Sequence, residues 1–599
     1  MSIQKYSINN SPIQTILTWI QSREIAVPEI QRPFVWDSSK VRDLVDSLYR
    51  GYPIGYLITW RNPQVKLKDG TASQGKRILI DGQQRVTALM AALLGHEIIN
   101  NDYKRTKIVI AFQPQEEKFE VYNPAIAKDN SWIPDISKII LMEVKVPKFV
   151  KEYCKHNSKA DEDKIYENIE LLRGIINNPL GIIELNSDLD IETVTEVFIR
   201  INSQGKALSQ ADFAMSKIAA NEIYGGNTLR KSIDYFCHLA IVPEFYKQIL
   251  DLDKNFTETE YFKEMAWLKD EKDDLYDPLY TDMLRVSFTS EFKRGRLQDL
   301  VALLSGRNFE TRTYEENIAE QSFELLKIGI MKFMNKTNFQ RFLMIVRSSG
   351  FIDVSMLRSQ NVLNVAYMVY LMLHSQKENP NKIETFVRRW LVLSILTGRY
   401  SGSPESRIDF DIKKIDEIGI GKYLASVEES ELSEAFWSAG LPSQLNTSVA
   451  SSPYFGVYLA SQVKTNDKGF LSKDITVKDL IELRGDVHHL FPKHYLKKRG
   501  LHRGKYNQIA NYVMMQSEIN IAVGDQEPAK YFSEILEKIR EGKPSKYGAI
   551  SDIETLQENF KAHCIPDGME NNTIENYDGF LEARRKLMAL KIRDYYFKL

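Results

Sequence analysis

The chain has 599 residues, of which 43% are apolar and 27% charged, a composition typical of a globular protein with several hydrophobic cores. Its formal net charge of −1 argues against a uniformly basic nucleic-acid-binding protein, so any surface for nucleic acid must be a local patch. The three cysteines form no Cys-x-x-Cys pair, which argues against a thiolate zinc site and fits a reducing compartment. We find no signal-peptide pattern and no apolar stretch long enough to span a bilayer, and we therefore expect a cytoplasmic protein without a membrane partner.

The first 123 residues alternate predicted helices and strands. Apolar periodicity predicts a helix that is capped by Ser11 and runs to Ile20, and a second helix that is capped by Ser38. Further predicted elements are strands at Tyr56–Trp60 and Arg77–Ile80, a buried helix at Val86–Leu94, a hairpin of Val109–Phe112 and Phe119–Tyr122, and a strand at Gly181–Leu185.

The remaining chain is mainly helical until a serine-rich segment at 422–463, and the last part is rich in histidine and basic residues. Gly225–Gly226 marks the first predicted boundary. We therefore predict three domains, at 1–225, 226–450 and 451–599. The middle domain carries no evident chemistry and is interpreted as a helical linker or a substrate sensor.

The first chemical signal is the sequence ILIDGQQR at residues 78–85, in which a short apolar strand ends at an Asp-Gly turn and enters a helix. Gln83, Gln84 and Arg85 then lie near a helix N-terminus, where free N–H groups and the helix dipole favour an anion. Arginine binds phosphate bidentately, and Asp81 could hold magnesium or activate water. The same residues also suit a generic turn with a surface salt bridge, so the pattern alone leaves both interpretations open. The sequence contains no Walker A motif, so hydrolysis of a nucleotide would proceed without a P-loop.

The strongest chemical signal is the sequence GDVHHLFPK at residues 485–493. Four of the nine histidines fall within fifteen residues, and seven Lys or Arg residues lie between Arg484 and Tyr506 with a single acid. Phosphodiester hydrolysis needs a base for the attacking water, a metal that neutralises developing charge, and cations that hold the backbone. Histidine suits the first role because its ordinary pKa of about 6.5 leaves a neutral imidazole near pH 7. The alternative is a pair of structural histidines in a polar loop; a zinc protease is excluded because the His-Glu-x-x-His helix is absent.

This segment resembles the first half of an HNH, or His-Me finger, nuclease motif in the form D-x-H-H-[IL]-F-P-K found in C-terminal domains of GmrSD-type restriction enzymes. That fold places a metal between a two-stranded ribbon and a helix. The resemblance implies His489 as the general base and His488 as a metal ligand. Downstream it implies that Asn511 orients the base and that Asn520 is the second metal ligand, with Asn507 as a competitor of Asn511.

Two further assignments follow from the same resemblance. Asp486 is implied either as a ligand of Mg²⁺ or Mn²⁺ or as a partner of a ligand, and Asn520 is a weaker anchor than the terminal histidine of the strict HNH pattern. The basic residues that would neutralise DNA phosphates, and that otherwise form a solvated face, are Lys493, Lys497, Lys498 and Arg499.

Three N-terminal segments resemble the N-terminal domain of GmrSD-type proteins, which has a ParB/sulfiredoxin-like fold. They are Pro28–Trp36, Asp46–Gly55 and the Asp-Gly-Gln-Gln-Arg turn, and a later segment at Phe198–Ser209 resembles the family element F-x-R-[IL]-N-S-x-G. The resemblance implies binding and hydrolysis of a nucleoside triphosphate (GTP, ATP or CTP), with Asp81 and Arg85 as catalytic residues. The implied nucleotide-binding residues are Asp81, Gly82, Gln83, Gln84, Arg85 and Arg32. The aromatic residues that could stack on a base, although their positions favour helix packing, are Trp36, Tyr49 and Tyr52.

The sequence thus predicts an α+β multidomain protein with a ParB-like N-terminal domain, a helical middle and a C-terminal ββα-metal nuclease domain. The expected function is nucleotide-regulated, metal-dependent cleavage of double-stranded DNA, in particular modified or phage DNA, with a homodimer left open. The alternative is a nucleotide-dependent DNA-binding regulator or toxin-type protein without cleavage. An RNA-directed nuclease is a third interpretation, because a ββα-metal element grips the backbone and carries little base information.

Overall fold

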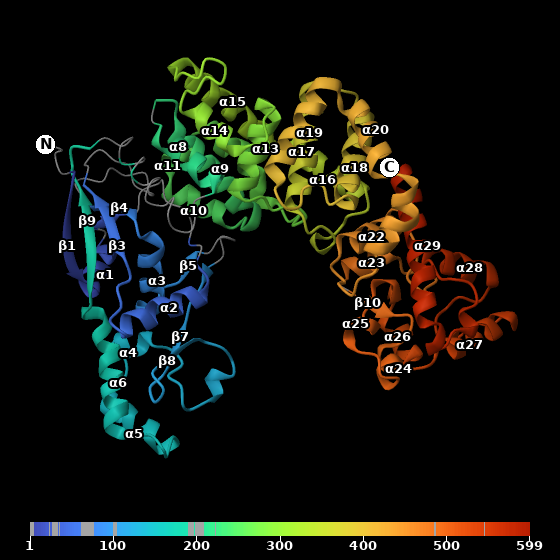
Figure 1. Cartoon of the computed structure of the whole chain (residues 1–599), viewed down its shortest axis with the longest axis horizontal. Helices are drawn as coiled ribbons and strands as arrows, with labels where there is room; N and C mark the ends of the chain where they lie inside the picture. Colours follow the sequence, from blue (N-terminus) through green and yellow to red (C-terminus); the bar gives the residue numbers. More distant parts are fainter. Residues whose placement is uncertain are drawn as a thin grey trace. The chain divides into compact units, whose positions relative to one another are not determined.

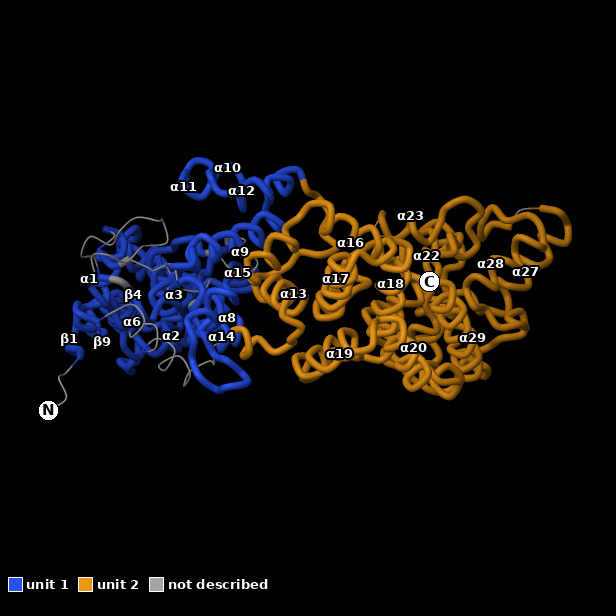
Figure 2. Tube along the Cα trace, turned by 90° about the horizontal axis from the view of Figure 1, so that it is seen from above, with its two compact units in different colours: residues 1–270, 301–323 blue, residues 271–300, 324–599 orange. Residues whose placement is uncertain are grey.

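A computed structural model describes residues 5–22, 24–26, 34, 36–61, 77–99, 105–189, 194, 197, 209–221, 223–483, 485, 487–543 and 545–599. Their contacts divide the chain into two compact units (Figure 2). Unit 1 contains Met1–Asp270 and Val301–Phe323, and unit 2 contains Glu271–Leu300 and Glu324–Leu599. This division reports packing within each unit, so the three functional domains expected from the sequence stay a prediction.

Unit 1 is built on a five-stranded mixed sheet with the order β1-β9-β3-β4-β2. The first strand pairs antiparallel with β9, β9 runs parallel to β3, β3 pairs antiparallel with β4, and β4 runs parallel to β2. The strands of this sheet are β1 Tyr6–Pro12, β2 Ile25–Ala26, β3 Tyr56–Trp60, β4 Arg77–Asp81 and β9 Pro179–Leu185. Helix α3 begins directly after β4, so the Asp-Gly turn is held between a central strand and a buried helix.

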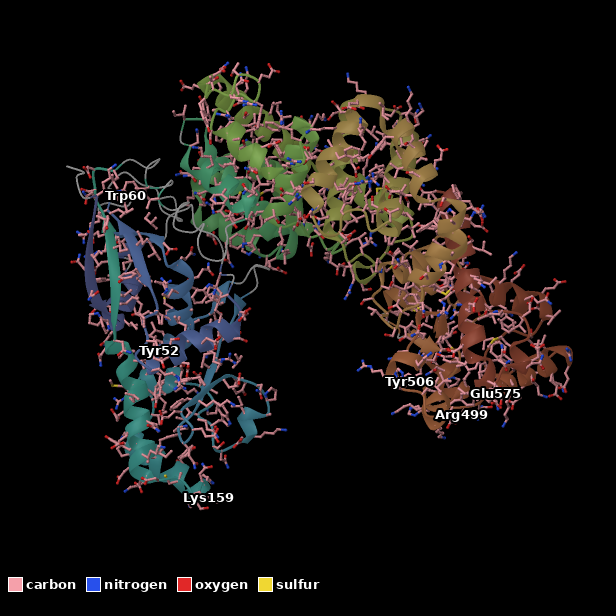
Figure 3. The ribbon with its side chains drawn as sticks, in the orientation of Figure 1. Tyr52, Trp60, Lys159, Arg499, Tyr506 and Glu575 are labelled. Atoms are coloured by element: carbon pink, nitrogen blue, oxygen red, sulfur yellow. The ribbon has the colours of Figure 1, made fainter. Side chains whose placement is uncertain are left out.

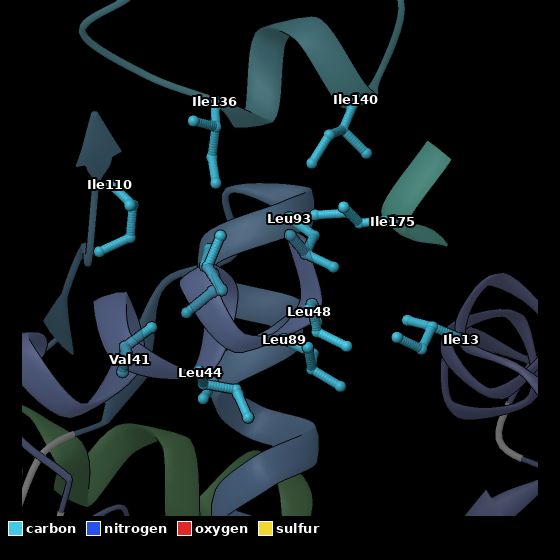
Figure 4. Packing of buried hydrophobic residues seen from close by; sticks show 14 of the residues in the cluster. Ile13, Val41, Leu44, Leu48, Leu89, Leu93, Ile110, Ile136, Ile140 and Ile175 are labelled. Atoms are coloured by element: carbon cyan, nitrogen blue, oxygen red, sulfur yellow. The ribbon is translucent and has the colours of Figure 1, made fainter. Parts of the chain in front are cut away.

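The core of unit 1 surrounds α3, as the packed side chains in Figure 4 show. Leu89 and Leu93 of α3 are fully buried, and Leu48 of α2 and Ile13 of α1 are buried in the same cluster. Because α3 is buried on several sides, the helix is fixed within the core of unit 1. The helices of this core are α1 Ile13–Gln21, α2 Ser38–Tyr49, α3 Gln83–Leu94, α4 Ser137–Ile140, α5 Val146–His156 and α6 Glu162–Gly174.

Most predicted elements of unit 1 are confirmed, and two predicted helix caps are wrong. Ser11 lies in β1 opposite Leu180, because the backbone there completes a strand pair, and α1 begins only at Ile13. The side chain of Asp37, rather than Ser38, caps α2 by accepting a hydrogen bond from the backbone N–H of Lys40 at 2.8 Å. The predicted hairpin is β7 Ile110–Gln113 paired with β8 Lys118–Val121, and a shorter pair joins β5 Ile98–Ile99 and β6 Arg105–Thr106.

The rest of unit 1 is helical and leads into helices shared between the units. Its helices are α8 Gln210–Ala220, α9 Gly226–Ile241, α10 Phe245–Leu252, α11 Lys254–Thr257 and α12 Glu260–Met265. The helices α14 Leu297–Leu304 and α15 Glu316–Met334 each contribute residues to both units.

Unit 2 begins as a cluster of helices around α17 (Figure 1). This helix is buried from Val362 to Leu373 and contacts α13, α16 and α18. The helices of the cluster are α13 Tyr280–Phe292, α16 Lys336–Ser348, α17 Gln360–Ser375, α18 Pro380–Leu396, α19 Pro404–Ile418, α20 Ile420–Glu431, α21 Leu441–Gln444 and α22 Pro453–Lys464.

The C-terminal part of unit 2 wraps helices around a short two-stranded ribbon. The ribbon consists of β10 Val487–His489 and β11 Tyr512–Met514. The surrounding helices are α23 Val477–Glu482, α24 Lys493–Lys498, α25 Arg503–Tyr506, α26 Ser517–Val523, α27 Pro528–Arg540, α28 Ile553–Ala562 and α29 Tyr577–Phe597. Among the described helices of both units, none combines the length and the apolar character needed to cross a membrane.

Candidate functional site

The C-terminal candidate site is built on the β10–β11 ribbon. The two strands pair antiparallel, with His489 opposite Tyr512 and His488 opposite Val513. Helix α26 follows β11 after two residues and carries Asn520. The ribbon followed by a helix is the order of elements that the sequence predicted for this region.

The imidazole of His489 is fixed by two neighbours. Its Nε2 lies 3.1 Å from Oδ1 of Asn507, and its ring meets the Tyr512 ring edge-on with centroids 5.0 Å apart. Because an amide oxygen can only accept, Nε2 carries the proton and donates it, which leaves the lone pair on Nδ1. Burial lowers the pKa of His489 below its usual value; the hydrogen bond to Asn507 opposes this, while the charges of Lys493 and His488 add to it.

Asn511 makes contacts other than the one expected of it. Its side chain is fully buried, accepts from the backbone N–H of Phe491 at 2.8 Å, and donates to the carbonyls of Phe491 and Tyr506. Its backbone carbonyl accepts from Leu490 N–H. Asn511 therefore clamps the loop that follows His489, whereas Asn507, the competitor, contacts the histidine ring.

Buried side chains from distant helices hold this clamp in place. Arg584 of α29 is fully buried and donates to the carbonyl of Ala510 at 2.7 Å and, through Nε and Nη2, to the carbonyl of His563. The Tyr531 hydroxyl of α27 donates to the carbonyl of Leu490 at 2.7 Å. These partners lie far along the sequence, and only the folded chain reveals them.

The expected metal ligands offer a weak donor set. His488 and Asn520 are half-buried, and Asn520 makes no side-chain hydrogen bond within the described residues. Asp486 lies outside the described residues. No group of three or more His, Cys, Asp or Glu side chains that could hold a metal occurs in the part of the chain that the structure describes. An imidazole and an amide oxygen fit a hydrated Mg²⁺ or Mn²⁺, which keeps several waters, better than they fit a zinc site with three or four protein ligands.

The basic residues after the histidines fall into two pairs. Lys498 forms an ion pair with Asp525, and Arg499 lies 3.8 Å from Glu527 while its guanidinium stacks on Tyr495. Lys493 and Lys497 are exposed and make no ion pair within the described chain, although the Lys493 ammonium lies 5.9 Å above the Tyr506 ring. Figure 3 labels Arg499 and Tyr506 on this face. Among these four residues, Lys493 and Lys497 are therefore the two whose charge no acid of the described chain compensates.

The N-terminal candidate site is the turn between β4 and α3. Gly82 caps α3 with φ +97°, a left-handed conformation that favours glycine. A Cβ at Gly82 would lie 2.4 Å from Cδ2 of Leu57 and 3.2 Å from Nη1 of Arg85. The glycine thus allows both the turn and the close approach of the arginine.

The Arg85 guanidinium lies against the backbone of β3 and the residue before it. Its Nη1 donates to the carbonyl of Tyr56 at 2.6 Å, and a Cβ at Gly55 would lie 3.0 Å from Nη2. Burial lowers the pKa of Arg85, and the nearby charge of Asp81 opposes this shift. Within the described chain the guanidinium makes no ion pair, so its remaining N–H groups are available to an anion.

The other expected nucleotide-binding residues surround this arginine in sequence. The side-chain oxygen of Gln83 is shielded from solvent and has no hydrogen-bond partner in the described residues, and Gln84 is buried. Arg32 lies outside the described residues, as does nearly all of the Phe198–Ser209 segment.

The three aromatic residues near these loops differ in exposure. Tyr49 is buried and packs against Phe112 and Phe119, and Trp36 packs on the core beneath Lys40. Tyr52, labelled in Figure 3, is 61% exposed. Tyr52 alone of these three is thus open to a planar ligand.

Residues 13–219 match the family described as GmrSD restriction endonuclease, N-terminal domain. The match covers about a third of the chain, including the strands β2, β3, β4 and β9 of the sheet and the Asp81–Arg85 turn. The chain is also similar to the uncharacterized protein MJ0686 of Methanocaldococcus jannaschii, with 24% identity over an alignment of 629 residues that covers 95% of this chain and 96% of the relative. This similarity extends through both units.

Proposed function

We propose that the chain is a metal-dependent DNA endonuclease of a defence system, and that its N-terminal unit binds a nucleoside triphosphate that regulates cleavage. The observation that carries the proposal is the His489 ring, oriented by Asn507 on a ribbon that is followed by a helix. The match of residues 13–219 to a restriction endonuclease N-terminal domain supports DNA as the substrate.

In this proposal His489 accepts the proton of the attacking water at Nδ1. Its Nε2–H stays bonded to Asn507, which orients the ring and stabilises the imidazolium that forms. Asn511 keeps the loop after His489 in place through Phe491. Lys493 and Lys497 bind the phosphates on either side of the scissile bond. Lys498 and Arg499 bind further phosphates once these replace the acidic residues with which they are paired.

His488 and Asn520, with Asp486, would hold Mg²⁺ or Mn²⁺. Such an ion supplies Lewis acidity that lowers the pKa of water and neutralises charge on the leaving oxygen.

The proposed nucleotide site is the Asp81–Arg85 turn, completed by Arg32. The half-buried Arg85 offers its guanidinium, and α3 its first turn, to phosphate oxygens, and Gln83 and Gln84 add amide donors. Asp81 lies beside Arg85 and activates water or holds the cation of the triphosphate.

A second candidate is a nucleotide-dependent regulator that binds DNA without cutting it. The absence, in the described residues, of a group of three or more strong metal-ligating side chains favours this candidate. In this candidate the basic residues still bind DNA, but the histidines do not catalyse cleavage.

The test is cleavage of unmodified plasmid and of phage DNA with modified bases, with Mg²⁺ or Mn²⁺ and with or without GTP, ATP or CTP. We expect metal-dependent cutting in the wild type and a loss of at least about 100-fold in His489→Ala. The exposed His502 provides the matched control, and His502→Ala should still cut. Equal cutting by His489→Ala would refute the nuclease assignment, and tight DNA binding without cutting on any substrate would favour the regulator.

A further inference from the structure

A separate cavity of about 830 Å³ lies within the helix cluster of unit 2. It is lined by residues of α15, α16, α17 and α18 and of the turn between α17 and α18. Sites for small molecules and cofactors typically have volumes of about 300–1,000 Å³. The cavity is therefore large enough for one ligand of nucleotide size, and none of the residues assigned above lines it.

The charges around the cavity favour an anion. The acidic residues Glu378 and Glu384 each have a basic partner outside the lining, at 3.6 Å and 2.8 Å. Lys332 is held by Glu291 at 2.9 Å. Arg341 and Lys377 also line the cavity, and within the described residues neither makes an ion pair. Two uncompensated cations at one cavity attract a phosphate or a similar anion.

The walls of the cavity favour a flat, partly apolar group. Tyr370 and His374 lie one turn apart on α17, and their rings are parallel within 7° with centroids 5.7 Å apart. The Tyr370 ring is buried, whereas His374 is exposed and leaves a ring face open. Aliphatic side chains of Ile345 and Leu371 complete the wall, and Met344, 66% exposed, supplies a flexible side chain.

We propose that this cavity binds a single nucleotide, with the base against His374 and the phosphate on Arg341 and Lys377. The ligand has two sources, a free nucleotide or a nucleotide rotated out of a DNA duplex. The second source rests on the proposed nuclease function, because a ββα-metal element contacts mainly the backbone and a base-sized cavity elsewhere would supply base selectivity.

The variants remove one feature each and spare the fold. Arg341→Gln and His374→Ala change exposed residues of α16 and α17. Lys377 has φ +56°, so Lys377→Gly removes the charge in a conformation that suits glycine. Lys336→Gln is the matched control, because it removes the same charge from an exposed residue of α16 that lies outside the lining and pairs with no acid among the described residues.

The first experiment is calorimetric titration of the full chain with dAMP, dCMP and 5-hydroxymethyl-dCMP, and with deoxyribose 5-phosphate as a base-free probe. We expect Arg341→Gln with Lys377→Gly to weaken binding of all four probes about tenfold or more. His374→Ala should weaken the nucleotides about threefold or more and leave the base-free probe unchanged. The second experiment measures the fluorescence of 2-aminopurine in a duplex, which rises when the base leaves the stack, with the same variants.

A response, either nucleotide binding or 2-aminopurine fluorescence, that is lost in these variants and kept in Lys336→Gln supports the proposal and identifies the source. If nucleotide binding and fluorescence are the same in all variants, the cavity proposal is refuted. This outcome includes the case in which free nucleotide binds only at the N-terminal turn. A chain that cuts no DNA but binds nucleotide through His374 would refute the nuclease and leave the cavity standing. Cleavage that depends on His489, together with unchanged nucleotide binding in the cavity variants, would support the nuclease and refute the cavity proposal.

Discussion

The two candidate sites differ in how their key side chains are held. At the ribbon, Asn511, Arg584 and Tyr531 reach in from three separate segments and bond to backbone carbonyls or N–H groups around His489. At the N-terminal turn, the one side-chain hydrogen bond that Arg85 makes within the described residues goes to the carbonyl of Tyr56, and its backbone is held by its own helix. A reaction that needs a fixed base gains from such bracing, whereas a turn held locally can adjust when a ligand arrives. We therefore expect the ribbon to tolerate little change and the turn to tolerate more.

The largest expected effect is the loss of stability of the ribbon when Arg584 is replaced. We expect Arg584→Met to destabilise the ribbon by about 3 kcal/mol, because the carbonyls of Ala510 and His563 lose charged donors in a buried site. Hydrogen exchange of the β10 and β11 amides measures this locally. The surface variant Lys586→Met on the same helix should change exchange by less than about 0.5 kcal/mol. Unchanged hydrogen exchange in Arg584→Met would show that Arg584 does not hold the ribbon, so the proposed difference between the two sites would fail.

The next effect is a loss of stability in acid. Burial lowers the pKa of His563 to about 3, partly offset by its hydrogen bond to the carbonyl of Lys468. The unfolded chain binds this proton below about pH 6.5 and the folded chain does not, so stability falls as pH decreases from about 6.5 towards 3. For this group alone the loss is about 1.4 kcal/mol per pH unit. Urea unfolding of wild type and His563→Gln at pH 6.5 and 4.5 should show a steeper loss in the wild type, and parallel losses would contradict the assignment.

A smaller pair of effects separates the two asparagines. Asn511→Ala leaves the buried N–H of Phe491 without a partner and should cost about 2 kcal/mol in urea unfolding. Asn507→Ala should change stability by less than about 0.5 kcal/mol and slow cleavage about tenfold or more, because the His489 ring loses its partner. If Asn511→Ala slows cleavage at unchanged stability, the two roles are exchanged.

The smallest effect concerns the N-terminal turn. Gly82→Ala should destabilise unit 1 by about 1–2 kcal/mol through its left-handed backbone, and it should also weaken nucleotide binding because the new methyl group approaches Leu57 and Arg85. Gly51→Ala has a similar φ of +70° with open space around it, so it carries only the backbone cost. Thermal unfolding and nucleotide titration of both variants give the comparison. Equal nucleotide affinity in the two variants would show that the turn does not position Arg85.

The elements that the sequence predicted correctly are those formed by residues close together in the chain. The strand–turn–helix at Arg77–Leu94 and the hairpin are confirmed because period-two and helical patterns report local burial. The sequence did not choose between Asn507 and Asn511, since both follow the histidines at suitable spacing and only the fold decides which amide faces the ring. Arg584 carried no signal at all, because its partners lie 21 and 74 residues away. Ser11 was assigned to a cap because its strand partner lies more than 160 residues further along.

The order of the sheet in unit 1 also dictates when it can be completed during synthesis. Strand β9 at Pro179–Leu185 is inserted between β1 and β3, so these two early strands have no direct partnership with each other. At about 5–20 residues per second, β1 waits roughly ten seconds or more on the ribosome for its neighbour. During that interval Ile8, which stays 57% exposed even in the finished sheet, lies on a strand with unpaired backbone groups. The nascent chain is therefore most vulnerable to misassociation before residue 185 emerges, and slowing translation upstream of β9 should increase its dependence on chaperones.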